Sequence, residues 1–90
     1  MYVRLETVRA KALFVSDVQP SDQPTAEEIR RAVAAALCQH RSRGCALQVA
    51  GEFGDHPELA AARMAWALTM IRAAYPIHVR LPARCLAMTG

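Results

Sequence analysis

Apolar residues recur every three or four positions along most of this chain, a spacing typical of one buried face of an α-helix. The first such segment predicts a helix over Thr7–Val15. The residues before it also alternate as a strand does ("YVRLETV"), so the start of the chain is expected to be frayed or extended. A loop is predicted over residues 16–25, where prolines and turn-forming side chains interrupt the pattern.

A second helix is predicted from Ala26 to about His40. Its start carries the sequence "TAEE", a capping box in which Thr25 and Glu28 each accept a hydrogen bond from the other residue's backbone N–H. Gly44 is predicted to end this helix in the left-handed conformation. The apolar stripe of this helix contains Ile29, Val33, Ala36, Leu37 and His40.

A short third helix is predicted over Cys45–Phe53, with Gly54 as the turn that closes it. Asp55 would then cap a fourth helix, and Glu58 would complete a second capping box in "DHPE". The fourth helix is predicted from about His56 to Ala74, because the proline at position 76 disfavours helix at the residue before it.

The fourth helix is apolar nearly all round. One stripe contains Leu59, Ala62, Trp66, Met70 and Ala73, and the other contains Ala60, Met64, Ala67, Ile71 and Ala74. A helix with two apolar stripes lies at the centre of its domain or packs against a second chain. The candidate residues of a dimer interface are Met64, Trp66, Met70 and Ile71.

These elements predict an all-α fold, a single domain of three or four helices over residues 1–75 with a helix-turn-helix-like corner. Residues 76–90 begin with "PIHVRLP", whose alternation is that of one short strand. Because a strand needs a partner, the alternative prediction for this segment is a mobile tail.

Composition supports the helical prediction, because alanine makes up much of the 53% apolar content. A chain of 90 residues buries a modest core, about 60–65% of its unfolded surface. A homodimer or a protein partner that covers further apolar surface is therefore expected. The net charge of +3 permits nucleic-acid binding without requiring it, since the arginines are scattered along the sequence.

The cysteines point to a reducing, cytoplasmic setting. Cys38, Cys45 and Cys85 are odd in number and lack the spacing of a disulfide framework. No secretory leader is recognisable. Arginines interrupt the longest apolar stretch before it reaches the roughly 18 residues of a membrane span, so no membrane contact is expected.

Catalytic and metal chemistry have little support in the sequence. Cys38, His40 and Cys45 form one loose cluster, whereas a structural zinc site uses two close ligand pairs. No nucleophile motif surrounds any serine or cysteine. We therefore expect no enzyme activity, no cofactor and no small-molecule substrate, because so small a core leaves little room for a pocket.

Cys45–Met64 resembles a helix-turn-helix DNA-binding unit. Val49 and Ala50 match the apolar and small residues that let two such helices cross, and Gly54 matches the turn glycine. Asp55 departs from the pattern, in which an apolar residue usually follows that glycine. The resemblance implies that the second helix of the unit presents its first turns to the major groove.

A DNA-binding role implies a set of contact residues. The candidates are Arg30, Arg31, Arg41, Arg43, His56 and Arg63. The same corner also carries Glu52, Asp55 and Glu58, which would repel phosphates. The positions that would read bases are mostly alanines, which offer only a methyl contact to thymine.

Three stretches, "ALFVSDVQPSD", "PTAEEIRRAV" and "RGCALQVAGEFGDHPELAAARMAWA", together resemble a set of small uncharacterised actinobacterial helical proteins over residues 12–67. That family brings no known activity. Two functional predictions stay open. The first is a small helix-turn-helix-like regulatory protein that contacts DNA. The alternative is a dimeric helical protein-interaction module with no DNA contact.

Overall fold

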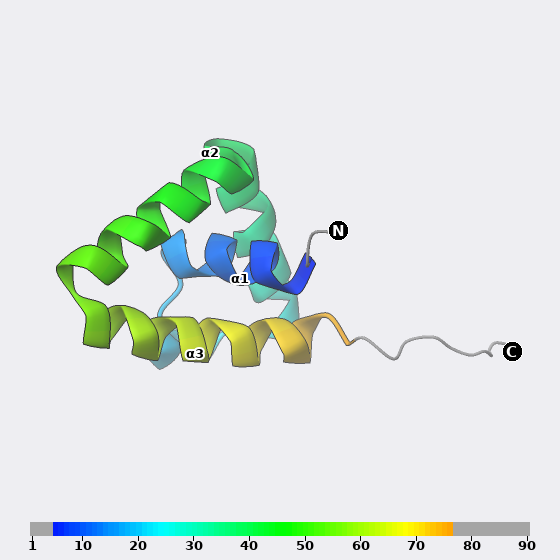
Figure 1. Cartoon of the computed structure of the whole chain (residues 1–90). Helices are drawn as coiled ribbons and strands as arrows, with labels where there is room; N and C mark the ends of the chain where they lie inside the picture. Colours follow the sequence, from blue (N-terminus) through cyan, green and yellow to red (C-terminus); the bar gives the residue numbers. More distant parts are fainter. Residues whose placement is uncertain (1–4, 77–90) are drawn as a thin grey trace, which may run out of the picture.

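Three α-helices follow one another in the computed structural model, which describes residues 5–76 (Figure 1). They are α1 (Leu5–Val15), α2 (Ala26–Asp55) and α3 (Pro57–Ala74), and a 3₁₀ turn, η1 (Pro20–Asp22), lies between α1 and α2. Residues 5–76 contain no strand, which confirms the all-α prediction. The predicted C-terminal strand or tail, and residues 1–4, lie outside the described residues.

The long helix α2 bends near its middle, so that its two segments and α3 surround α1 (Figure 1). Each of the three helices packs against the other two. The largest side chains that are completely buried come from all three helices: Leu13, Ile29, Cys45 and Ile71. One core therefore joins residues that are far apart in the sequence.

The two apolar stripes of α3 have different surroundings. The stripe predicted at Ala60, Met64, Ala67, Ile71 and Ala74 faces the core, with Met64 half-buried and the other four buried. In the other stripe, Leu59 is exposed, as are the alanines at positions 62 and 73, and only Trp66 and Met70 are partly covered. The chain therefore covers one apolar face of α3 itself and leaves much of the other open.

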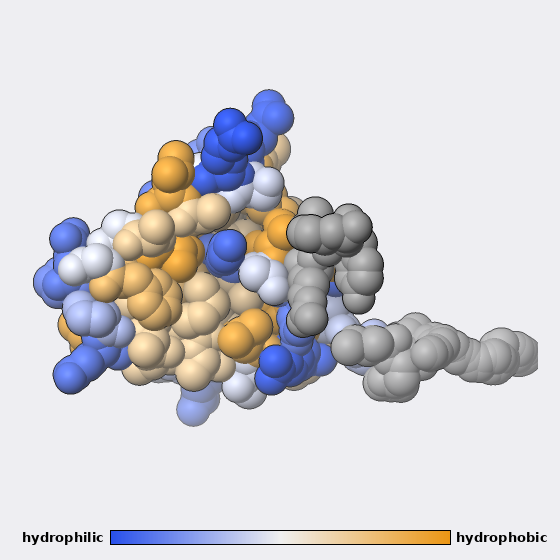
Figure 2. All heavy atoms as spheres, in the orientation of Figure 1, coloured by the Kyte–Doolittle hydropathy of each residue, from blue (hydrophilic) through white to orange (hydrophobic). Residues whose placement is uncertain are grey.

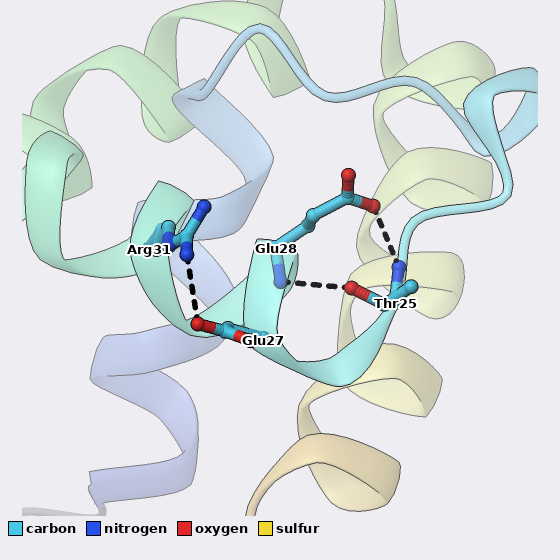
Figure 3. Close-up of polar contacts among 4 residues, drawn as sticks. All are labelled: Thr25, Glu27, Glu28 and Arg31. Atoms are coloured by element: carbon cyan, nitrogen blue, oxygen red, sulfur yellow. Dashed lines mark hydrogen bonds and ion pairs between the residues drawn. The ribbon is translucent and has the colours of Figure 1, made fainter.

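The start of α2 has the predicted capping box (Figure 3). The Thr25 hydroxyl accepts a hydrogen bond from the backbone N–H of Glu28 at 3.1 Å, and the Glu28 carboxylate accepts one from the Thr25 N–H at 2.9 Å. One turn on, Arg31 forms an exposed ion pair with Glu27. The prediction for this end of the helix is confirmed.

Replacing Thr25 with alanine is expected to lower the free energy of unfolding by about 1 kcal/mol, because the N–H of Glu28 loses its acceptor. Thr69→Ala is the matched control. Its hydroxyl binds the Ala65 carbonyl on the exposed side of α3, and that carbonyl already accepts within the helix. Urea denaturation followed by circular dichroism measures both. Equal losses in the two variants would contradict the role of the cap.

The prediction that Gly44 ends the second helix is wrong. Helical structure continues from Ala26 to Asp55, and the interruption lies at Arg41, with φ 63° and ψ 170°. Gly44 does not have positive φ. A Cβ placed on it would lie 3.2 Å from the Cβ of His40, so the small residue serves close packing between turns. The predicted end of the second helix at about His40 is confirmed, because the helical backbone is interrupted at the next residue, Arg41. The predicted third helix is the segment of α2 after this bend.

The backbone at Arg41 occupies a region of φ and ψ that is almost confined to glycine, at a cost of about 1–3 kcal/mol for other residues. Arg41→Gly is therefore expected to raise the free energy of unfolding by about 1 kcal/mol, after the greater freedom of glycine in the unfolded chain is taken into account. Arg43→Gly, on an exposed helical residue, should instead lower it by a similar amount. If both variants lose stability, Arg41 does not have this glycine-like backbone conformation.

The predicted turn at Gly54 and the capping box at "DHPE" are also wrong. The helix α2 runs through Asp55, and His56 alone, with φ −140° and ψ 69°, connects it to α3. No side chain caps the start of α3. Pro57 does occupy its first turn, as expected, where a missing N–H is harmless. The corner is made by one non-helical residue followed by proline.

Gly54 therefore lies within a helix and has open space around it. Gly54→Ala is expected to raise the free energy of unfolding by about 0.5–1 kcal/mol, because alanine favours helix over glycine by that amount. Thermal denaturation measures the change. If Gly54→Ala instead destabilises the protein, Gly54 has the turn conformation that the sequence pattern predicts.

Candidate functional site

A hollow of about 510 Å³ lies at the corner where α2 meets α3, and the end of α1 forms its base. The helix α1 contributes Phe14 and Val15, and α3 contributes Leu59, Ala60 and Arg63. The lining residues from α2 are Gln48, Gly51, Glu52 and Asp55. The hollow exists because the single connecting residue sets the ends of two helices at an angle over α1.

Two large apolar side chains at this corner are not fully covered. Phe53 stacks on Phe14, with ring centroids 6.2 Å apart, yet it remains 38% exposed. Leu59 is 71% exposed. Figure 2 shows apolar residues gathered over the second segment of α2 and over α3, with hydrophilic residues around the end where the two helices meet. Exposed apolar surface of this kind is typical of interaction sites.

Acidic side chains form the rim of the hollow. Glu52 and Asp55 line it from α2, whereas Glu58, in the first turn of α3, lines a neighbouring hollow that shares only Leu59 with this one. All three are exposed, and none forms an ion pair with another residue of the described chain. The rim therefore presents negative charge next to an apolar surface.

Arg63 anchors the end of α1 to α3. Its Nε donates to the Phe14 carbonyl at 2.7 Å. Its Nη2 lies within hydrogen-bond distance of three more carbonyl oxygens, those of Leu13 (3.4 Å), Ser16 (3.1 Å) and Val18 (2.9 Å). The last carbonyls of a helix have no partner within it, so one guanidinium satisfies both the helix end and the following loop. Burial of the group lowers the pKa of Arg63 through desolvation.

The guanidinium of Arg63 also lies over two aromatic rings. Its central carbon is 5.7 Å from the centre of the Phe14 ring and 5.1 Å from that of Trp66. These cation–π contacts hold the side chain against the domain. The structure thus gives Arg63, a candidate DNA contact, an internal role.

The other candidate DNA contacts do not converge on one surface. Arg30 donates to the Ala74 carbonyl at the end of α3, and Arg31 pairs with a glutamate of its own helix. Arg41 and Arg43 are exposed near the bend of α2. His56 is exposed at the acid-rimmed corner.

The charge of the described domain is balanced. Residues 5–76 contain eight arginines and lysines and eight aspartates and glutamates. The net charge of +3 comes from Arg4, Arg80 and Arg84, which lie outside this range. A neutral domain lacks the positive field that attracts the phosphate backbone.

The candidate dimer residues lie mostly against the chain's own core. Ile71 is 1% exposed, so its side chain is covered within one molecule. Met64, Trp66 and Met70 are half-buried and pack against the core cluster. The exposed apolar side chains nearby are instead Phe53 and Leu59, at the corner.

The cysteines and histidines do not assemble into a metal site in the described part of the chain. Cys38 is exposed, whereas Cys45 is buried and its thiol lies 3.9 Å from the Ala36 carbonyl. Burial raises the pKa of the Cys45 thiol by desolvation. Residues 5–76 hold no group of three or more potential metal ligands. Within the same range, no helix is long and apolar enough to cross a membrane.

No protein-family model, no curated protein and no solved structure matches this chain. The resemblance to actinobacterial helical proteins and that to helix-turn-helix units stay predictions. The site is described by its own geometry, a hollow lined by both apolar and polar side chains with two acids on its α2 side.

The sequence pattern did not reveal the hollow. Its base comes from α1, more than thirty residues before the corner, and periodicity within one helix says nothing about such pairs. The one available signal was the combination of Phe53 and Leu59 with three acids within eight residues of sequence.

Proposed function

We propose that this domain is a protein-interaction module, and that the hollow at the α2–α3 corner binds a polypeptide segment carrying both basic and apolar side chains. The observation that carries the proposal is the exposure of Leu59, 71% open beside a hollow of about 510 Å³. The hollow has room for one or two large side chains.

The charge of the rim defines the partner. Glu52 and Asp55 favour arginine or lysine in the bound segment, because opposite charges attract and like charges are rejected. The apolar base favours leucine or a similar side chain. Burial of a leucine contributes about 1.5–3 kcal/mol, and the ionic contacts add specificity.

Fluorescence anisotropy tests this proposal with a labelled synthetic peptide of alternating arginine and leucine. The full chain should bind it in a saturable way, and added salt should weaken the binding by screening the exposed charges. A peptide of alternating glutamate and leucine, with the same apolar content, should not bind. Equal binding of both peptides, or of neither, would contradict the proposal.

Two exposed leucines provide a matched pair of variants. Leu59→Ser should weaken binding of the arginine–leucine peptide about tenfold or more, because an apolar contact is lost at the hollow. Leu47→Ser removes a leucine that is 68% exposed on α2 but does not line the hollow, and it should leave affinity unchanged. The same effect in both variants would show that binding is not at the corner.

DNA binding is the second candidate function. Arg41 and Arg43 support it, because both are exposed near the bend of α2 and neither forms an ion pair with a described residue. If this surface binds DNA, Arg41→Ala and Arg43→Ala should each reduce the salt dependence of binding by about one unit. Absence of binding to random duplex at roughly tens of micromolar protein in low salt would remove this candidate.

A further inference from the structure

We infer that α2 straightens at Arg41 and that two copies of this chain then exchange residues 42–76, which gives a domain-swapped dimer. In this dimer, residues 42–76 of each copy pack against residues 5–40 of the other. The inference does not rest on the proposed function, because no contact of a ligand with the hollow is needed for it.

The hinge of this exchange is a single residue. Arg41 is the residue of α2 with non-helical dihedral angles, φ 63° and ψ 170°, in a region almost confined to glycine. A helical conformation at Arg41 would relieve this strain. It would turn the 30 residues of α2 into one straight helix about 45 Å long. The straight helix would carry residues 42–76 away from α1, around which α2 bends in the monomer (Figure 1).

The two halves of the domain, residues 5–40 and residues 42–76, bury each other's apolar faces. Leu13 and Ile29 belong to the first half, Cys45 and Ile71 belong to the second, and all four are fully buried in one core cluster. Straightening of α2 would expose both faces. A second copy in the same open form supplies the missing half, as in other domain-swapped dimers.

Polar contacts between the two halves make the exchange specific. Arg63 donates to backbone carbonyls of residues 13–18. Arg30 donates to the Ala74 carbonyl at 3.1 Å, and Nε of Arg72 lies 2.5 Å from a carboxylate oxygen of Glu6. Exchange restores all of these contacts between the copies, whereas packing of two open copies in another arrangement would leave them unmade.

The exchange also preserves the corner hollow. Phe14 and Val15 would come from one copy, and the lining residues from α2 and α3 would come from the other. Each dimer would therefore have two hollows, and both copies would contribute residues to each. The core contacts of α3, such as those of Ile71, would be the same in both forms.

Contacts across the bend oppose the exchange, but they are weak. Gln48 Nε2 lies 3.2 Å from His40 Nδ1 on the exposed surface, and the Cys45 thiol lies 3.9 Å from the Ala36 carbonyl. Residues eight positions apart are separated by about 12 Å along a straight helix, so the first contact would be lost. Tethering gives the two halves of one chain an effective concentration on the order of millimolar. The monomer is therefore the form in dilute solution, and the dimer forms at high protein concentration.

Refolding from urea tests the exchange, because the halves separate only when the core opens. The full chain, carrying Cys38→Ser and Cys85→Ser to prevent disulfides, is refolded over a series from roughly 10 µM to roughly 1 mM, the range of the effective concentration. Light scattering after gel filtration then measures the dimer fraction. We expect monomer at the low end and dimer at the high end. Absence of a dimer over the whole series would overturn the inference.

Glycine substitutions test the hinge in the same series. Arg41→Gly should raise the dissociation constant of the dimer on the order of 10²-fold or more, because glycine tolerates the bend and disfavours the straight helix in both copies. Arg43→Gly is the matched control, since residue 43 is helical in both forms, and it should leave the constant unchanged. Equal effects of the two substitutions would overturn the inference.

A cross-linking experiment distinguishes exchange from simple side-by-side association. Glu6→Cys and Arg72→Cys are introduced into separate chains, and the two proteins are refolded together at high concentration. Residue 6 of one copy then lies beside residue 72 of the other, so a short bismaleimide should join the two chains at these positions, as peptide mass spectrometry would show. Neither variant refolded alone should cross-link in this way. A dimer in which the mixture cross-links no faster than either variant alone would overturn the inference.

Discussion

Replacing Arg63 with alanine is expected to lower the free energy of unfolding by about 3 kcal/mol, as measured by urea denaturation of the full chain. The guanidinium donates to the carbonyls of Leu13, Phe14, Ser16 and Val18. Alanine would remove this donor from the last three, whereas the Leu13 carbonyl still accepts from the backbone N–H and the hydroxyl of Ser16. Each hydrogen bond to a charged group contributes about 1.5–3 kcal/mol. Water can satisfy some of these carbonyls in the variant, so the losses do not add fully.

The stabilisation by Arg63 depends on the planar shape of its guanidinium group as well as on its charge. Arg63→Lys should recover only part of the lost stability, since an ammonium cannot present the same fork of N–H donors. Arg43→Ala is the matched control, because this exposed arginine forms no ion pair with a described residue and its loss should change stability by less than about 0.5 kcal/mol. If the two alanine variants unfold at the same urea concentration, Arg63 has no structural role.

Ile71→Ala is expected to lower the free energy of unfolding by about 2–4 kcal/mol through loss of packing and formation of a cavity. Its side chain is 1% exposed among the core residues of α1, α2 and α3. Because the packing lies within one molecule, the loss should be the same at low and high protein concentration.

This result would distinguish a core residue from an interface residue. Leu59→Ala is the control on the same helix, and at 71% exposure it should change stability by less than about 0.5 kcal/mol. If the loss of unfolding free energy caused by Ile71→Ala grows with protein concentration, Ile71 lies in a dimer interface instead, as the two apolar stripes of the sequence predict.

Much of the fold follows from local sequence signals. The helix over residues 7–15 was predicted and begins two residues earlier, and α3 ends at Ala74 as predicted. The capping box at Thr25 was predicted from four residues. These features depend on side chains and backbone groups within one or two turns, so the sequence contains the information directly.

The errors concern the places where helices end, and they have a common physical cause. Glycines at positions 44 and 54 predicted a helix end and a turn, yet both lie within α2. The bend occurs at Arg41 and the corner at His56, neither of which has strong turn propensity. Packing around α1 overrides local preference at both positions.

The site was predicted less well than the fold, because its parts are distant in sequence. From the sequence of its own helix, Arg63 was predicted as a candidate DNA contact. Its contacts with carbonyls of residues 13–18 depend on how α1 lies against α3. The sequence analysis correctly identified the acids at the corner. The structure adds that Phe14, from the distant helix α1, forms an apolar base beside them.

The central claim is that the α2–α3 corner binds polypeptide. The most direct test is an amide NMR spectrum of the ¹⁵N-labelled full chain during titration with the arginine–leucine peptide. We expect the largest shifts at Gly51, Glu52 and Leu59, and no comparable change when random duplex DNA replaces the peptide. Shifts centred on Arg41 and Arg43 upon addition of duplex, with none at the corner upon addition of peptide, would contradict the claim.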